Sequence, residues 1–173
     1  MNLERSVPWA AALAIATVGG SLVAACLMPF VALAAMAAST LPRREGVATM
    51  LVAWAANQLL GFTLLGYPLD AATQGWGVAI GVAALAAYGV IATVIARSNA
   101  LLPLLGAAVL GFIAYELVLY AYGAAGGGTG AFTQAIVLLL ARNEVLWLAG
   151  LLVVRAAVLR LAPGWAPSLR AAA

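Results

Sequence analysis

The residues best suited to chemistry in this chain are a few polar side chains that interrupt long apolar segments. They are Asn57 and Gln58 in one segment, Glu116 in another, and Arg142, Asn143 and Glu144 in a third. An ionisable group inside a bilayer is costly, so it normally faces a partner, a cavity or a functional site. Amide, carboxylate and guanidinium groups can hydrogen-bond to a small solute or pair with its charges. These three segments therefore carry the candidate site.

The spacing of these groups predicts that they converge. Phe112, Glu116 and Tyr120 follow one another at one-turn intervals and so share a helical face. Trp54 lies one turn before Gln58. Counted at about 1.5 Å per residue from the outer helix ends, the polar groups lie roughly 10–20 Å deep, which predicts a shared pocket in the outer half of the membrane. The predicted substrate-binding residues are Trp54, Asn57, Gln58, Glu116, Tyr120, Arg142, Asn143 and Glu144.

The same polar groups have a structural alternative. Glu116 would pair with Arg142, and Asn57 or Gln58 would hydrogen-bond to a neighbouring helix and serve packing alone. A ligand pocket and a packing network use the same residues, so the sequence leaves both interpretations open.

The residue types that are missing exclude several kinds of active site. The sequence has no His and no Lys, and Cys26 is its one cysteine. It therefore lacks the ligands for zinc, haem or iron–sulfur clusters, a Ser-His-Asp triad, a Schiff-base lysine and a P-loop lysine. A basic patch with interleaved aromatic residues, which would indicate a nucleic-acid partner, is also missing. We expect no metal, no cofactor and no catalytic motif, and ATP would supply energy only through a partner.

The composition requires a membrane, not water, as the main solvent. Of 173 residues, 66% are hydrophobic and 8% are charged, and the mean hydropathy is +1.12. Soluble domains carry about 25% charged residues. At about 20 apolar residues per crossing, this length predicts a single all-α integral membrane domain over residues 1–173, a polytopic helix bundle of about six spans. The spans are expected at 7–27, 29–41, 46–66, 75–96, 101–123 and 131–161.

Two stretches are too long for a single simple crossing. Residues 7–41 would form a rod of about 50 Å, whereas the hydrocarbon core is about 30 Å thick, so a turn is expected near Pro29. Residues 131–161 either break near Arg142, which would expose backbone groups to a solute, or form one tilted helix that emerges near Arg155. The sequence leaves these two possibilities open.

The arginines predict the orientation. With six spans and the N-terminus inside, every arginine at a span end falls at or near the cytoplasmic side, as the positive-inside rule requires. These arginines are Arg5, Arg43, Arg44, Arg97, Arg155, Arg160 and Arg170. The apolar run after Arg5 continues to Leu41 without the polar sequence that follows a cleaved signal peptide, so we expect a retained span. The predicted location is the bacterial inner membrane, with both termini in the cytoplasm.

Small residues mark candidate contact faces in two spans. Those of the first span are Ala10, Ala12, Ala14 and Ala16. Gly77 and Gly81 have the same spacing in the fourth span. Such faces let helices approach closely, either within the bundle or against another membrane subunit.

Several architectural features together resemble a known transporter family. Six short spans, the alanine-rich first span, a short second span and the turn Leu41-Pro42-Arg43-Arg44-Glu45-Gly46 are similar to the substrate-binding (S) subunits of energy-coupling-factor vitamin transporters. The resemblance is architectural and covers most of the chain. It implies that the small-residue face of the first span docks on a transmembrane coupling subunit, that ATPases supply energy, and that a vitamin-like solute binds near the outer side. It implies no particular ligand.

Three functions are compatible with these features. The first is a solute-binding uptake subunit for a small organic micronutrient. In it, Glu116 would meet cationic or hydroxyl groups and Arg142 an anionic group, while Trp54 and Tyr120 would stack on the solute. The second is a structural or assembly subunit of a larger membrane complex. The third is a lipid-active membrane enzyme, in which Glu116 and Glu144 would form the catalytic pair. Asp70 is the only aspartate, so the paired-aspartate pattern of phosphatidyl-alcohol transferases is absent.

Overall fold

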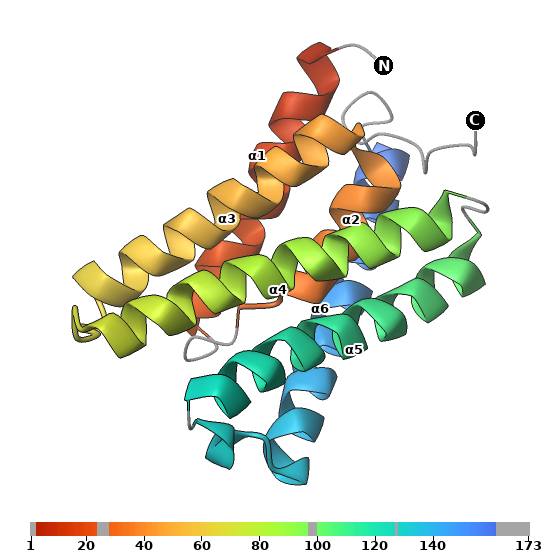
Figure 1. Cartoon of the computed structure of the whole chain (residues 1–173). Helices are drawn as coiled ribbons and strands as arrows, with labels where there is room; N and C mark the ends of the chain where they lie inside the picture. The colour runs from red at the N-terminus through yellow and green to blue at the C-terminus, as the bar shows by residue number, and fades with distance from the viewer. Residues whose placement is uncertain (1–2, 24–27, 97–99, 127, 162–173) are drawn as a thin grey trace.

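The chain folds into a bundle of α-helices (Figure 1). The computed structural model describes residues 3–23, 28–96, 100–126 and 128–161. Within these ranges the protein is all-helical, as the sequence predicts. The helices are α1 (Leu3–Val23), α2 (Phe30–Thr40), α3 (Arg43–Thr63), α4 (Ala71–Ile95), α5 (Leu101–Gly126), the short 3-10 helix η1 (Thr129–Ala131) and α6 (Gln134–Leu161).

Four of these helices, α3 to α6, are long and apolar enough to cross a membrane. They match the predicted spans 46–66, 75–96, 101–123 and 131–161 to within a few residues at most ends. Helix α6 runs without a break through Arg142, so the interrupted-helix interpretation of this stretch is wrong and the single long helix is confirmed. The apolar parts of the first two helices are shorter, covering Val7–Gly20 and Phe30–Thr40.

Helix α2 lies at the centre of the bundle. All 11 of its residues are buried, and it packs against each of the other five α-helices. A helix that is small and apolar on every side can be enclosed in this way. At about 1.5 Å per residue it is about 16 Å long, roughly half of a hydrocarbon core. The predicted turn before it includes Pro29, whereas residues 24–27, with Cys26, lie outside the described part of the chain.

The N-terminal helix, α1, is hydrogen-bonded to the C-terminal end of α2. The indole Nε1 of Trp9 donates a hydrogen bond of 3.0 Å to Thr40 Oγ1, and both residues are buried. Helix α1 also packs along α3. On α1, Ala12 and Ala16 are exposed, Ala10 is half-buried and Ala14 is buried. The four alanines therefore do not form one exposed face, because residues two apart point to nearly opposite sides of a helix.

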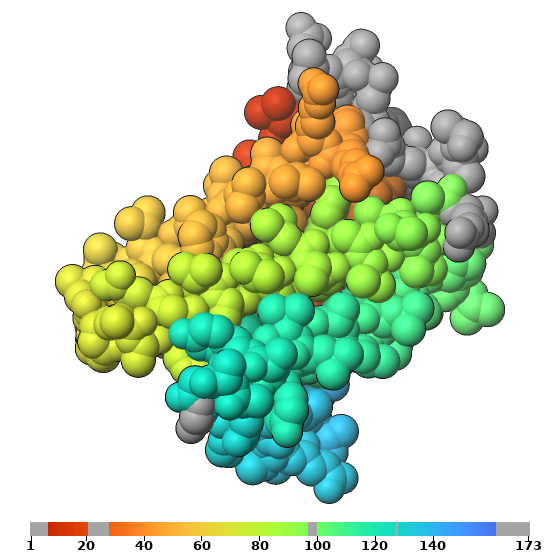
Figure 2. Space-filling view, in the orientation of Figure 1, coloured from red at the N-terminus to blue at the C-terminus, as the bar shows by residue number. Residues whose placement is uncertain are grey.

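Helices α3 and α4 approach closely through the glycines of α4. Trp54 Nε1 donates a 2.8 Å hydrogen bond to the carbonyl oxygen of Gly77. A Cβ on Gly81 would lie 2.8 Å from Trp54 Nε1, and one on Gly77 would lie 2.6 Å from Gln58 Oε1. The small-residue face of α4 thus serves packing within the bundle. Figure 2 shows α4 between α3 and α5 on one face of the molecule, with part of α6 emerging beyond α5.

The loop between α3 and α4 ends in a helix cap. Asp70 is the N-cap of α4, and its Oδ1 accepts a 2.7 Å hydrogen bond from the Thr73 backbone N–H. This backbone hydrogen bond, together with the Thr73 side chain, lowers the pKa of Asp70 below its ordinary value. The same loop turns at Gly66, whose φ of 68° favours glycine.

Candidate functional site

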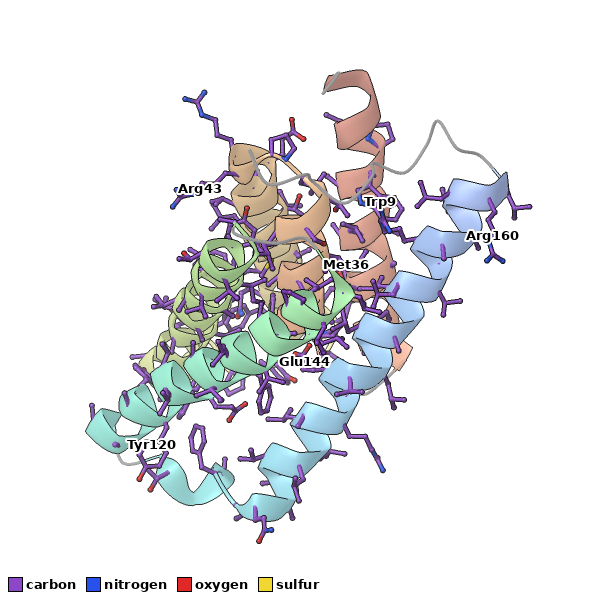
Figure 3. All side chains as sticks on the ribbon, turned by 90° about the vertical axis from the view of Figure 1, so that its right-hand side faces the viewer. Trp9, Met36, Arg43, Tyr120, Glu144 and Arg160 are labelled. Carbon is purple, nitrogen blue, oxygen red and sulfur yellow. The ribbon has the colours of Figure 1, made fainter. Side chains whose placement is uncertain are left out.

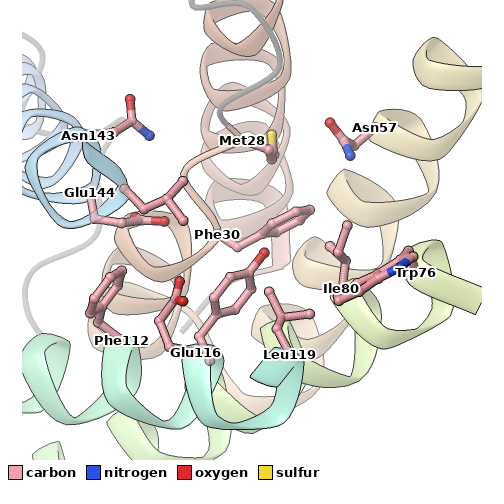
Figure 4. A pocket seen from close by; sticks show the side chains of 12 residues that line it. Met28, Phe30, Asn57, Trp76, Ile80, Phe112, Glu116, Leu119, Asn143 and Glu144 are labelled. Atoms are coloured by element: carbon pink, nitrogen blue, oxygen red, sulfur yellow. The ribbon is translucent and has the colours of Figure 1, made fainter. Parts of the chain in front are cut away.

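Two adjoining cavities lie among α3, α4, α5 and α6, beside the start of α2, and Figure 4 shows the first of them. The first has a volume of about 220 Å³ and the second about 230 Å³. The first is lined by Met28, Phe30, Asn57, Trp76, Ile80, Phe112, Tyr115, Glu116, Leu119, Leu140, Asn143 and Glu144. The second is lined by Trp76, Glu116, Leu119, Ala131, Phe132, Ile136 and Leu140. Four residues line both, so the two cavities adjoin. We call the first, which Asn57, Asn143 and Glu144 line, the polar end, and the second the apolar arm.

Glu144 supplies the polar wall on α6 and also caps α2. Its carboxylate oxygens accept hydrogen bonds from the backbone N–H groups of Val31, at 3.3 Å, and Ala32, at 2.7 Å. Pro29 precedes α2 and provides no side-chain cap. The free amides and positive end of the helix dipole at a helix N-terminus favour a carboxylate. Glu144 therefore holds the buried start of α2 in place while forming one side of the cavity.

Glu116 supplies a second carboxyl group, from α5, without such partners. Its Oε1 atom is buried and makes no hydrogen bond to any described residue. Figure 4 shows the carboxyl groups of Glu116 and Glu144 directed into the same space between α5 and α6. The proposed ion pair between Glu116 and Arg142 is wrong for the described part of the chain, because Arg142 is exposed on the outer face of α6.

Two amides complete the polar end. Asn143 precedes Glu144 on α6, and Asn57 reaches the cavity from α3. In Figure 4 they lie on opposite sides of Met28. The structure thus brings together four of the eight predicted site residues, one from α3, one from α5 and two from α6.

The other four predicted residues lie outside the cavity walls. Trp54 and Gln58 pack on the glycines of α4, as described above. Arg142 is exposed, since it lies about 100° around the helix from its neighbour Asn143. Tyr120 is 50% exposed, and its ring meets that of Phe132 edge-on, with the centroids 5.4 Å apart. Tyr120 therefore packs against Phe132, a residue of the cavity wall, without lining the cavity itself.

Aromatic rings form much of the remaining wall. Phe30 at the start of α2 stacks on Tyr115, with ring centroids 6.3 Å apart. The ring centroid of Trp76, on α4, lies 6.5 Å from that of Phe132, which follows η1. Phe30, Trp76 and Phe132 are not among the site residues that the sequence predicted. The wall is therefore more aromatic than the spacing of polar residues indicated.

Helical spacing does account for two lining residues that were missed. Leu119 is three positions after Glu116, and Leu140 is four positions before Glu144, so each shares the face of its carboxylate. By contrast, the start of α2 enters the site through tertiary packing, for which no local signal exists.

The site combines carboxyl, amide and aromatic groups, which can hydrogen-bond to a small molecule and pack against it. Within the described ranges, no group of three or more His, Cys, Asp or Glu residues could hold a metal ion. No known protein family, curated protein or solved structure matches this chain.

Proposed function

We propose that this is an integral membrane protein that binds a small organic solute, such as a micronutrient, in the outer half of its helix bundle. The observation that supports the proposal is the cavity itself: two carboxyl groups and two amides converge with aromatic rings inside helices long enough to span a membrane. Ligand sites are typically concave and largely apolar, with a few convergent polar groups. Polar groups placed this way inside a membrane protein normally serve function.

The proposed topology has six passes with both termini in the cytoplasm of a bacterial inner membrane. Figure 3 supports it, because Arg43 and Arg160 lie toward one end of the molecule, Tyr120 lies at the other, and Glu144 lies between them. Arginines gathered at one end indicate the cytoplasmic side. Arg97 and Arg170 lie outside the described residues, as does the side chain of Arg5. The cavity then opens toward the outer side, and α2 contributes a half-span.

The proposed role is that of an uptake subunit that depends on partners for energy. The sequence has no lysine and hence no P-loop of its own. The resemblance to S subunits of energy-coupling-factor transporters suggests a transmembrane coupling subunit and ATPases. On α1, Ala12 and Ala16 are exposed and available for such a contact, whereas Ala14 is buried.

Native mass spectrometry of the gently solubilised protein tests this role. We expect a bound small molecule in the wild type and its loss in Leu119→Trp, because Leu119 is 9% exposed and lines both cavities. Leu117→Trp is the matched control, since Leu117 is 61% exposed on the same helix and should leave binding unchanged. A ligand-free wild type with a stably bound protein subunit would instead support an assembly role.

A further inference from the structure

The cavity is lined by carboxyl groups from α5 and α6. Glu116 and Glu144 line it, and of the residues that the structure describes, none lining either cavity is basic. Arg142, the neighbour of Asn143 on α6, is exposed and lines neither cavity. The cavity therefore offers two carboxyl groups, and no basic group among the described residues, to whatever enters it.

The two carboxyl groups differ in what remains for a ligand. The two carboxylate oxygens of Glu144 already accept hydrogen bonds from the backbone N–H groups of Val31 and Ala32. Glu116 Oε1 is buried and has no hydrogen-bond partner among the described residues. A buried acceptor without a donor is costly, so this oxygen is the position at which a ligand donor would be stabilised most.

The aromatic wall suits the same kind of ligand. Tyr115, Phe30 and Trp76 line the first cavity, and a cation near an aromatic face is attracted by the ring electrons. The adjoining arm, by contrast, is lined almost entirely by apolar groups, among them Phe132, Ile136 and Leu140. A molecule that matches both regions has a charged donor at one end and an apolar body at the other.

We infer that the solute is an organic cation: a protonated amine whose N–H groups donate to Glu116, beside Glu144, and whose apolar part occupies the arm bounded by Phe132. Asn57, whose amide can both donate and accept hydrogen bonds, also lines the polar end. This inference rests on the proposed solute-binding function and narrows it to one ligand class. It also replaces the sequence-based expectation that Arg142 meets an anionic group.

A fractionated metabolite mixture tests the ligand class. Water-soluble yeast extract is separated by ion exchange at neutral pH into cationic, neutral and anionic pools. Each pool is incubated with purified protein, and retained compounds are identified by mass spectrometry after rapid gel filtration. We expect retention from the cationic pool only. Glu116→Gln should weaken it by roughly tenfold or more, since hydrogen bonds to charged groups contribute about 1.5–3 kcal/mol.

The controls separate failure of this inference from failure of the proposed function. Glu45→Gln removes a carboxylate at the start of α3, away from both cavities, and should retain as much as the wild type. Retention from the neutral or anionic pool overturns the inference and leaves solute binding intact. If the protein retains no compound from any pool, the cation inference and the proposed solute-binding function are both overturned. Cation retention that Glu116→Gln leaves unchanged, in a variant with wild-type thermal stability, also overturns the assignment.

Discussion

At the scale of single residues, the cavity shows how one residue type takes two roles. Glu144 is bonded to two backbone amides of α2, whereas the buried oxygen of Glu116 has no described partner. The first carboxylate contributes chiefly to stability, and the second is available to a ligand. Both interrupt apolar segments in the same way, so their sequence context alone does not distinguish them.

Removing the acceptor at position 144 should therefore destabilise the fold. Glu144→Leu leaves the N–H groups of Val31 and Ala32 buried without a partner, which should lower the unfolding free energy by about 1.5–3 kcal/mol. Thermal unfolding in detergent measures the change. Glu116→Gln is the control and should unfold close to the wild type, because it breaks no described hydrogen bond. Equal destabilisation by the two changes would refute the distinction.

Asp70 predicts a local dependence on pH. The Thr73 N–H lowers the pKa of Asp70 in the folded state below its ordinary value of 3.8. The cap is therefore fully present above that value and is lost as the pH falls through the lower, folded-state pKa. We expect the first turn of α4 to lose hydrogen-exchange protection in that acidic range. Asn is an equally good N-cap and does not titrate, so Asp70→Asn should remove this dependence.

At the scale of helices, the sequence predicted which segments form helices but not how each is rotated. A membrane helix exposes apolar residues to lipid and also buries them, so no amphipathic pattern indicates which side faces inward. In α3, Asn57 turns toward the cavity while Trp54 and Gln58 turn toward α4. In α6, Asn143 turns inward and Arg142 outward. The position of each polar residue along its helix could be counted from the sequence. The side of the helix that faces the cavity depends on packing between helices.

The contact between α3 and α4 can be tested with two glycines of one helix. A Cβ at Gly81 would lie 2.8 Å from the Trp54 indole nitrogen, so Gly81→Ala should lower stability by about 1–3 kcal/mol through overpacking. A Cβ at Gly89 would meet nothing within 4 Å. Gly89→Ala should therefore be neutral or slightly stabilising. Thermal unfolding of the two variants measures the difference, and similar melting temperatures would show that α4 does not approach α3 this closely.

At the scale of the whole molecule, the proposed orientation places the α3–α4 loop outside and the start of α3 in the cytoplasm. Leu69 is 73% exposed in that loop, and Arg44 is exposed in the first turn of α3. In a Cys26→Ala background, Leu69→Cys should react with a membrane-impermeant maleimide on intact spheroplasts. Arg44→Cys should react only after the membrane is opened. The reverse pattern would invert the topology and place the cavity toward the cytoplasm.

The cap on α2 also has a consequence for the order of events during biosynthesis. Ala32 and the glutamate that accepts its N–H are 112 residues apart in the chain. At about 5–20 residues per second, the ribosome needs roughly 5–20 s to proceed from one to the other. During that interval α3, α4 and α5 are synthesised, and the backbone N–H groups at the start of α2 do not yet have the Glu144 carboxylate as an acceptor. The last helix of the chain therefore supplies the cap of the central one.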